Sequence, residues 1–245
     1  MDKHQTKPPL IALKAIRFAY PGARPIFDNL DFGFYSGDRV GLLAPNGSGK
    51  TTLFHLIMGL LKPDAGDIEI FGKPVATEKQ FVEVRQRIGL LFQDADDQLF
   101  SPTVLEDVAF GPLNMGKSKQ EAVDISRRTL SFLGLSGFED RITFKLSGGE
   151  KRLVSLATVL AMEPEVLLLD EPMSGLDADT RLKLKEVLDT VNISYMVISH
   201  DIDFLIEATD TIYTLADGRI AKDDKDYVHR HDHAHLFGPV PHQHK

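Results

Sequence analysis

Hydrophobic and polar residues alternate along the first third of the chain in a way that predicts strands. Residues 10–20 and 26–38 alternate apolar and polar side chains and end in turn-forming dipeptides, so we expect an antiparallel pair there. The short apolar run 39–43 predicts a buried strand that leads into a glycine-rich turn. Helical spacing over 51–61 predicts a helix that ends before the next proline, and 66–72 has the pattern of another strand.

The middle of the chain, from about residue 79 to residue 163, has a mostly helical pattern. Residues 117–135 and 148–162 are amphipathic with helical spacing. Residues 165–172 then form an apolar run of strand length, typical of a strand buried on both faces, and 194–201 repeat that pattern after a helical segment. Alternating strands and helices around the helical stretch predict a parallel α/β core with an inserted subdomain.

These patterns divide the chain into three parts. We expect residues 1–90 and 164–222 to form the α/β core together with an N-terminal antiparallel β subdomain, and residues 91–163 to form the helical subdomain. Residues 223–245 are charged and histidine-rich without core-forming periodicity, and are predicted to be a mobile tail.

Composition limits the function more than the fold. The 245 residues are 42% apolar and 26% charged, which is ordinary for a soluble globular protein. A formal charge of −8 argues against a dedicated nucleic-acid-binding protein, and the absence of cysteine excludes disulfides and thiolate metal sites. There is no apolar run of roughly 18 residues and no signal-peptide core, so we expect the chain in the cytosol.

The segment LLAPNGSGKTT, residues 42–52, carries the clearest chemistry. Gly47 and Gly49 allow backbone N–H groups to turn toward phosphate oxygens, and the following helix directs its positive dipole end at the same anion. Lys50 supplies a positive charge for the β- and γ-phosphates, and the Thr51 hydroxyl is a candidate Mg²⁺ ligand. The predicted nucleotide-binding residues here are Asn46, Gly47, Ser48, Gly49, Lys50, Thr51 and Thr52. A glycine-rich turn without a ligand is the alternative.

The phosphate-binding pattern has glycine at its first position, where this chain has Ala44. The following Pro45 pushes Ala44 into the extended region, in which φ is negative and a Cβ is tolerated. We therefore expect the loop to be functional with alanine.

Two acidic residues lie near the end of the apolar run 165–172. Neighbouring residues of a strand point to opposite sides, so we expect Asp170 and Glu171 to have different roles. Asp170 would face Lys50 and Thr51 and hold Mg²⁺, directly or through water, and Glu171 would polarise an attacking water. A strand end whose acidic residues only cap a helix is the alternative.

Residues 146–150, LSGGE, admit two interpretations. Ser147 and Glu150 have the spacing of a capping box, with which many helices begin. Two glycines in a first turn cost about 1 kcal/mol each relative to alanine, but they expose N–H groups that can bind an anion. We therefore predict that Ser147, Gly148 and Gly149 contact nucleotide.

Together these motifs resemble the ATP-binding subunits of ABC transporters, which are P-loop NTPases with a RecA-like core, over roughly residues 10–222. The loop with Ala44 resembles Walker A, LSGGE resembles the signature motif with Glu150 in place of glutamine, and Asp170 and Glu171 end a Walker B motif. The resemblance adds Tyr20, where an aromatic ring stacks on adenine, Gln93 of the Q-loop, a D-loop at 174–177, and His200, the switch histidine that contacts the γ-phosphate.

The resemblance implies an ATPase that uses ATP and Mg²⁺. The implied catalytic residues are Glu171, His200 and Gln93, and the implied Mg²⁺ ligands are Thr51, Gln93 and Asp170. In the family, Walker A of one subunit faces the signature of another, which implies that this chain needs a second ATPase subunit, either a copy of itself or a paralogue. Glu150 puts one contact with the opposing nucleotide in doubt, although its capping role gives the carboxylate another place to point.

Residues 92–116 resemble more narrowly the energy-coupling-factor group, whose ATPases drive uptake of cobalt, nickel and vitamins through a separate transmembrane protein and a substrate-capturing component. We expect residues 93–116 to shape the groove that receives the coupling helices of the transmembrane protein. This would place the chain at the cytoplasmic face of the membrane as a peripheral subunit.

Four histidines of the tail, His229, His231, His233 and His235, alternate with other residues, so an extended chain would place them on one side. Imidazole suits nickel, cobalt, zinc and copper. A solvated tail without function, or a remnant of an expression tag, is the alternative. With the resemblance of 92–116, the histidines favour nickel or cobalt over vitamins as the transported substrate.

We therefore predict an ATP-hydrolysing subunit of a nickel or cobalt importer. A vitamin importer or another ABC transporter is the alternative within this class. An ABC ATPase that acts on DNA or ribosomes is the alternative outside it, but such proteins usually carry coiled-coil, zinc or linker insertions or a second cassette. We expect no nucleic-acid partner.

Overall fold

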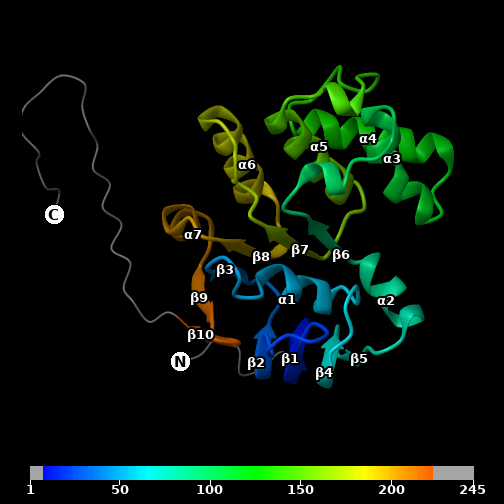
Figure 1. Cartoon of the computed structure of the whole chain (residues 1–245). Helices are drawn as coiled ribbons and strands as arrows, with labels where there is room; N and C mark the ends of the chain where they lie inside the picture. The colour runs from blue at the N-terminus through cyan, green and yellow to red at the C-terminus, as the bar shows by residue number, and fades with distance from the viewer. Residues whose placement is uncertain (1–7, 223–245) are drawn as a thin grey trace, which may run out of the picture.

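In the computed structural model, which describes residues 8–222, the chain forms two β-sheets with helices between them and on the outer face of the larger sheet (Figure 1). The smaller sheet is antiparallel, with strand order β2-β1-β4-β5. Its strands are β1 (Ile11–Phe18), β2 (Phe27–Phe34), β4 (Ala65–Ile70) and β5 (Lys73–Pro74).

The larger sheet has strand order β10-β9-β3-β8-β7-β6 and is parallel except for β10, which pairs antiparallel with β9. Its strands are β3 (Arg39–Leu43), β6 (Ile88–Leu91), β7 (Val166–Asp170), β8 (Ser194–Ser199), β9 (Thr211–Ala216) and β10 (Arg219–Lys222). The carboxyl ends of the parallel strands β3, β8 and β7 meet at one edge, which is where open α/β sheets place their ligands.

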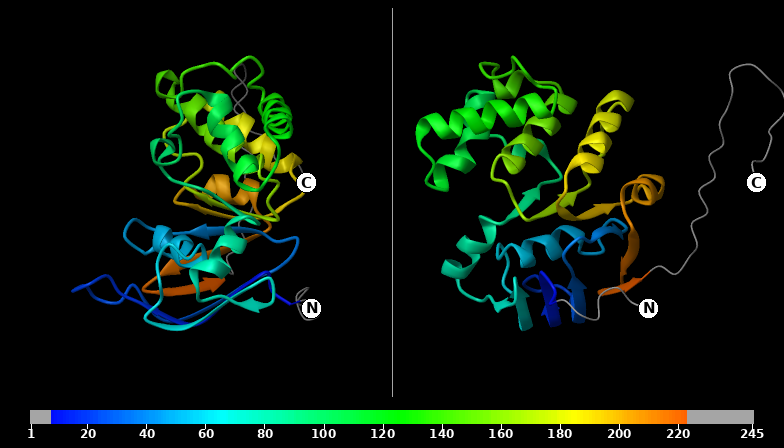
Figure 2. Two further views of the ribbon diagram at one scale, coloured as in Figure 1. Left: turned by 90° about the vertical axis from the view of Figure 1, so that its right-hand side faces the viewer. Right: turned by 180° about the vertical axis from the view of Figure 1, so that it is seen from behind.

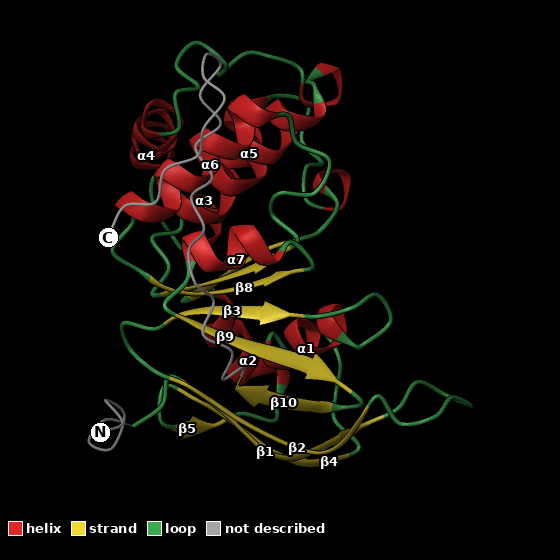
Figure 3. Ribbon diagram, turned by 90° about the vertical axis from the view of Figure 1, so that its left-hand side faces the viewer, coloured by secondary structure: helices red, strands yellow, loops and turns green. Residues whose placement is uncertain are grey.

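Helices lie on both faces of the larger sheet. Their bounds are α1 (Lys50–Ile57), α2 (Glu78–Arg85), α3 (Val104–Asn114), α4 (Lys119–Phe132), α5 (Gly148–Leu160), α6 (Ala178–Thr190) and α7 (Ile202–Ala208), with 3₁₀ turns at Ala95–Asp97 and Thr143–Lys145. Figure 3 shows α1 and α2 between the two sheets and the other helices beyond the larger sheet. In Figure 2, α3, α4 and α5 gather at the end of the molecule remote from the smaller sheet.

The burial of the strands follows their polarity patterns. In the antiparallel pair, Ile11 lies opposite Phe34 and Leu13 opposite Phe32, and all four side chains enter the core that packs on α1. Strands β7 and β8 are buried along their whole length, as the continuous apolar runs predicted, because helices cover both of their faces. The predicted fold class, a parallel α/β core with an antiparallel β part and added helices, is confirmed.

One local expectation was wrong, and one strand was not expected. The helix expected over 51–61 ends at Ile57, because the chain turns at Gly59 (φ 67), where the ring of Phe81 occupies the space of a side chain. The stretch expected to be mostly helical from residue 79 contains strand β6, which extends the larger sheet beside β7. No helix within residues 8–222 has the length and apolar character to cross a bilayer.

Candidate functional site

The phosphate-binding loop joins β3 to α1, and its two glycines are needed for different reasons. Gly49 has φ 94, and a Cβ on it would clash with Ile26. Gly47 has φ 81 with no described atom near the position of a Cβ, so only its backbone conformation requires glycine. Within the described chain no side chain caps the start of α1, so its first N–H groups are available to an anion.

Ala44 at the end of β3 is fully buried, and its methyl group belongs to the core that packs on α1. Its φ is not positive, as predicted from Pro45, so the position does not need the conformational freedom of glycine. The Ala44 N–H faces the carbonyl of Ser199 at 3.4 Å, which fixes the start of the loop to β8. The methyl group therefore contributes packing at the base of the loop.

Lys50 is buried at the first position of α1 and forms an ion pair with a buried carboxylate. Its Nζ donates to Glu171 Oε1 at 2.5 Å and to Asn46 Oδ1 at 3.2 Å. The other oxygen of Glu171, Oε2, lies 2.9 Å from His200 Nδ1. Burial alone would raise the pKa of Glu171, but the hydrogen bonds from Lys50 and His200 lower it below its ordinary value.

Asp170 and Thr51 form a second contact beside this pair. The Thr51 hydroxyl donates to Asp170 Oδ2 at 2.7 Å, while Asp170 Oδ1 is buried without a hydrogen-bond partner among the described residues. Burial raises the pKa of Asp170, and the hydrogen bond from Thr51 opposes this rise. A hydroxyl and an unpaired carboxylate oxygen suit a hard cation such as Mg²⁺, so these two residues fit the predicted metal position.

The expectation that Asp170 and Glu171 point to opposite sides was wrong. Both side chains reach the first turn of α1, where Asp170 binds Thr51 and Glu171 binds Lys50. Strand β7 ends at Asp170, and Glu171 has φ 46, so the alternation of a strand no longer applies to it. The two carboxylates therefore differ in the residue of α1 that each one contacts, and they do not lie on opposite faces of the sheet.

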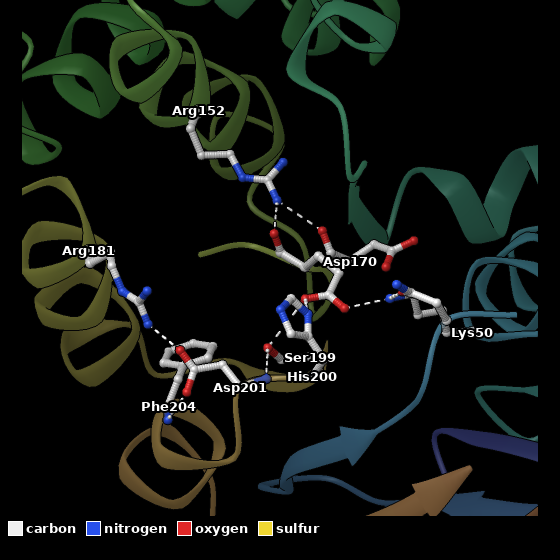
Figure 4. A network of polar contacts seen from close by, with 10 residues as sticks. Lys50, Arg152, Asp170, Arg181, Ser199, His200, Asp201 and Phe204 are labelled. Carbon is white, nitrogen blue, oxygen red and sulfur yellow. Dashed lines mark hydrogen bonds and ion pairs between the residues drawn. The ribbon is translucent and has the colours of Figure 1, made fainter. Parts of the chain in front are cut away.

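His200 lies between β8 and α7, and its neighbours hold the backbone there. Asp201 caps α7 by accepting from the Phe204 N–H at 3.1 Å, and its own N–H donates to Ser199 Oγ at 3.1 Å. Arg181 of α6 forms an ion pair with Asp201 (Figure 4). These contacts leave the His200 ring largely exposed while its Nδ1 is bound to Glu171.

Two other predicted residues line the surroundings of the loop. The Tyr20 hydroxyl lies 3.3 Å from Thr52 Oγ1, and the partly exposed ring packs edge-on against Phe18, so it borders the first turn of α1. Gln93 is exposed and, with Thr51 and Gly148, borders a hollow of about 680 Å³. Stacking of Tyr20 on adenine and a metal contact of Gln93 stay predictions.

The signature turn begins α5 with a complete capping box. The Ser147 side chain accepts from the Glu150 N–H, and Glu150 Oε2 accepts from the Ser147 N–H at 2.8 Å. Gly148 faces open space in the described structure, whereas a Cβ on Gly149 would lie 2.7 Å from Thr180 Oγ1. Gly149 therefore has a packing role against the start of α6 that the sequence did not reveal.

The sequence patterns did not indicate a role for two arginines near the signature, Arg141 and Arg152. Arg141 binds both oxygens of Glu150, with Nη1 at 2.7 Å from Oε1 and Nη2 at 3.2 Å from Oε2. Arg152 is buried and donates to backbone carbonyls of the Q-loop and of the turn after β7. Arg152 directly follows Glu150 and Lys151 in the sequence, so the pattern did not distinguish it from an exposed charged residue of the helix.

The four tail histidines His229, His231, His233 and His235 lie outside the described residues. Within residues 8–222, no group of three or more histidine, aspartate or glutamate side chains is arranged to hold a metal ion.

Sequence and structure comparisons agree with the motifs. The sequence model of the family described as ABC transporter matches residues 27–174. The chain belongs to the ABC transporter ATP-binding family. It therefore binds ATP with Mg²⁺ and hydrolyses it, as the motifs predicted.

Curated relatives and solved structures indicate which group within the family this chain resembles. The energy-coupling factor transporter ATP-binding protein EcfA of Methanocaldococcus jannaschii is 42% identical over 218 residues, which cover 87% of this chain and 78% of that protein. EcfA of Methanothermobacter thermautotrophicus is 40% identical over 86% of this chain and 69% of that protein. The structure of cbiO1 from Clostridium perfringens, part of the ABC transporter complex cbiONQ, matches with a TM-score of 0.77, 33% identity and 88% of both chains.

A further structure adds the oligomeric context of a relative. The ATP-binding cassette MJ0796, solved as a dimer in a post-hydrolysis state with ADP and Pi, matches with a TM-score of 0.79, 25% identity, 87% of this chain and 97% of that one. The predicted resemblance of the ABC ATPase to the energy-coupling-factor type is confirmed by the EcfA relatives.

Proposed function

We propose that this ABC ATPase powers an importer of nickel or cobalt ions at the cytoplasmic face of the membrane. The observation that carries the ATPase chemistry is the convergence of Lys50, Asp170, Glu171 and His200 on the uncapped start of α1. The choice of metal is supported by the resemblance of residues 92–116 to the energy-coupling-factor group and by the tail histidines. A vitamin importer or another ABC transporter is the alternative.

The proposed reaction begins from the contact between Lys50 and Glu171. When ATP binds over the first turn of α1, Lys50 would contact its β- and γ-phosphates in place of Glu171. The Glu171 carboxylate would then be released from Lys50. Glu171 then orients the attacking water, and His200, already bound to the same carboxylate, contacts the γ-phosphate. Thr51, Asp170 and Gln93 would hold Mg²⁺, which would neutralise charge on the phosphates.

A second ATPase subunit would complete the site. Ser147 and Gly148 are exposed at the start of α5, and the open space beside Gly148 leaves room for a phosphate of the opposing nucleotide. The dimer of the MJ0796 relative supports this arrangement. Because this chain has one copy of each motif, a homodimer would have two complete sites, and a dimer with a paralogue is the alternative.

The remaining partners are a transmembrane coupling protein and a substrate-capture component. Residues 93–116 would form the docking groove for the coupling helices, since they connect Gln93 to α3 on the surface of the helical end. ATP-driven movement at Gln93 would then reach the transmembrane protein. No nucleic-acid partner is part of this proposal.

Replacing Glu171 by glutamine tests the hydrolytic assignment. Glutamine keeps the shape but cannot accept a proton from water, so we expect hydrolysis to fall about 100-fold or more and an ATP-bound dimer to accumulate with Mg²⁺. Light scattering after gel filtration measures the dimer. Glu165→Gln, in an exposed ion pair with Arg87, is the matched control and should behave like the wild type. Hydrolysis near the wild-type rate in Glu171→Gln would refute the assigned role.

The same variant tests the substrate in cells that contain the whole transporter. Nickel and cobalt accumulation should fall to background with Glu171→Gln. Removal of residues 229–245 should leave most of the uptake and abolish binding of nickel and cobalt by the isolated chain. Unchanged nickel and cobalt accumulation, with loss of vitamin uptake, would favour the alternative.

A further inference from the structure

Arg152 lies in α5, and only 3% of its surface is exposed. All of its hydrogen bonds within the described structure go to backbone carbonyls. The acceptors are Phe92 and Gln93 (3.3 Å) for Nη1, Pro172 (3.0 Å) for Nε, and Asp170 (2.9 Å) and Glu171 (2.7 Å) for Nη2. Figure 4 shows the guanidinium reaching from α5 toward the strand end that carries Asp170. One planar group thus joins two loops.

An ion pair does not account for the burial of Arg152. No carboxylate oxygen in residues 8–222 accepts a hydrogen bond from Arg152, although Asp170, Asp94 and Glu171 attract it from a distance. Burial lowers its pKa to about 10, so the group is still positively charged at neutral pH. The rigid fork of the guanidinium is instead matched to the positions of the carbonyls, which a lysine could not satisfy together.

The bound carbonyls belong to the segments that carry Glu171 and Gln93. Glu171 has φ 46, a backbone conformation that residues with side chains rarely adopt, so the surrounding structure must hold it. Its carbonyl accepts from Arg152 and, at 3.1 Å, from the Ser174 N–H, and its own N–H donates to the Ile198 carbonyl at 2.9 Å. This conformation directs the Glu171 carboxylate to Lys50 and His200.

We propose that Arg152 is a positioning residue for ATP hydrolysis, which fixes the backbones of Glu171 and Gln93 to the signature helix. The inference rests on the proposed role of Glu171 in orienting water. Arg152 shares α5 with Ser147 to Gly149, so a shift of this helix when the signature turn meets the opposing nucleotide moves the carbonyls of both loops together. The Glu171 carboxylate and the Q-loop would thereby move together with α5.

Other contacts keep α5 packed on the Q-loop without Arg152. Gln98 Nε2 donates to the Ser155 carbonyl at 2.8 Å, and Gln98 Oε1 accepts from the Phe92 N–H at 3.2 Å. Lys151 pairs with Asp96 at 2.5 Å. Loss of Arg152 should therefore act mainly on the turn after β7, where Glu171 lies, and less on the attachment of the Q-loop.

The test is Arg152→Ala in the full chain, with steady-state ATPase assays and equilibrium binding of ATP. We expect kcat to fall about 10- to 100-fold while the Kd for ATP changes less than about threefold, because Lys50, Thr51 and the loop N–H groups are untouched. Millimolar methylguanidinium should restore much of the rate by occupying the vacated space, whereas methylammonium should not. Arg17→Ala, which removes an exposed arginine paired with Asp28, should show neither loss nor rescue.

The outcomes separate this inference from the proposal on which it rests. If Glu171→Gln is inactive but Arg152→Ala keeps the wild-type kcat, or if its loss appears only in the Kd for ATP, the positioning role is overturned. If Glu171→Gln itself hydrolyses ATP normally, both fail. Should the alanine variant not fold, Arg152→Lys keeps the charge but cannot bridge both loops. A kcat about three- to tenfold lower is then expected, and a wild-type kcat contradicts the role.

Discussion

At the scale of single residues, Glu150 shows how a substitution within a motif is accommodated. The sequence left open whether a carboxylate at this position would repel the opposing nucleotide. Both of its oxygens bind Arg141, one of them also accepts from the Ser147 N–H, and these hydrogen bonds, that from Arg141 first, lower the pKa of Glu150. The negative charge is therefore matched by an adjacent positive one, and the signature turn does not present an unpaired anion to phosphate.

Arg141→Gln should weaken ATP-driven dimerisation, because Glu150 would then face the nucleotide without its counter-charge. In the Glu171→Gln background we expect the ATP concentration at half-maximal dimer formation to rise about three- to tenfold, with little change in thermal stability since the pair is partly exposed.

The double variant Arg141→Gln, Glu150→Gln is the control for this charge argument. A glutamine at 150 keeps the spacing of the capping box and removes the charge, so the double variant should regain most of the wild-type affinity. An equal loss in the single and double variants would show that Arg141 acts through packing on Phe138 instead.

At the scale of secondary-structure elements, the two glycines at the start of α5, Gly148 and Gly149, are expected to have different roles. Gly148→Ala has space for its methyl group and should stabilise the helix by up to about 1 kcal/mol. It should nevertheless reduce ATP-driven dimerisation, because the methyl group covers exposed N–H groups.

Gly149→Ala would clash with Thr180, whose hydroxyl donates to Asp177 at the cap of α6. The unfolding free energy should therefore fall by about 1–3 kcal/mol.

Urea unfolding and light scattering on both alanine variants distinguish these effects. Equal destabilisation of the two variants would contradict the geometry of the turn. Normal dimer formation by Gly148→Ala would contradict the proposed contact with nucleotide.

The elements also show what the sequence could and could not predict. Polarity patterns sufficed for strands such as β1 and β7, since their burial is set by period and by flanking turns. The early end of α1 depends on Phe81, which is distant in sequence and fills the space beside Gly59. The placement of Glu171 depends on one positive φ, and the role of Arg152 on carbonyls from two loops. Such tertiary contacts leave no periodic signal.

At the scale of the whole molecule, apolar side chains remain exposed where α3 begins. Phe100 and Phe144 are 67% and 73% exposed, and Phe100 packs edge-on against Phe110 of α3 at 4.8 Å between ring centres. The segment that carries Phe144 is joined to the segment that follows Phe100, because Thr143 donates to the carbonyls of Ser101 and Pro102. Large exposed apolar side chains often mark interaction sites, so we expect these rings to be covered in the proposed transporter.

Replacing Phe100 and Phe144 by serine should therefore affect assembly and leave the isolated ATPase unchanged. Exposed rings contribute little to the fold, so the unfolding free energy should change by less than about 1 kcal/mol, and the ATP-bound dimer of the Glu171→Gln variant should still form. Association with the proposed transmembrane partner in detergent should weaken at least about tenfold, since aromatic anchors dominate interface energetics. Val82→Ser, at an exposed apolar position on α2, is the matched control. Unchanged association of the double variant would show that the transmembrane protein docks elsewhere, and that these rings do not transmit the ATP-driven movement.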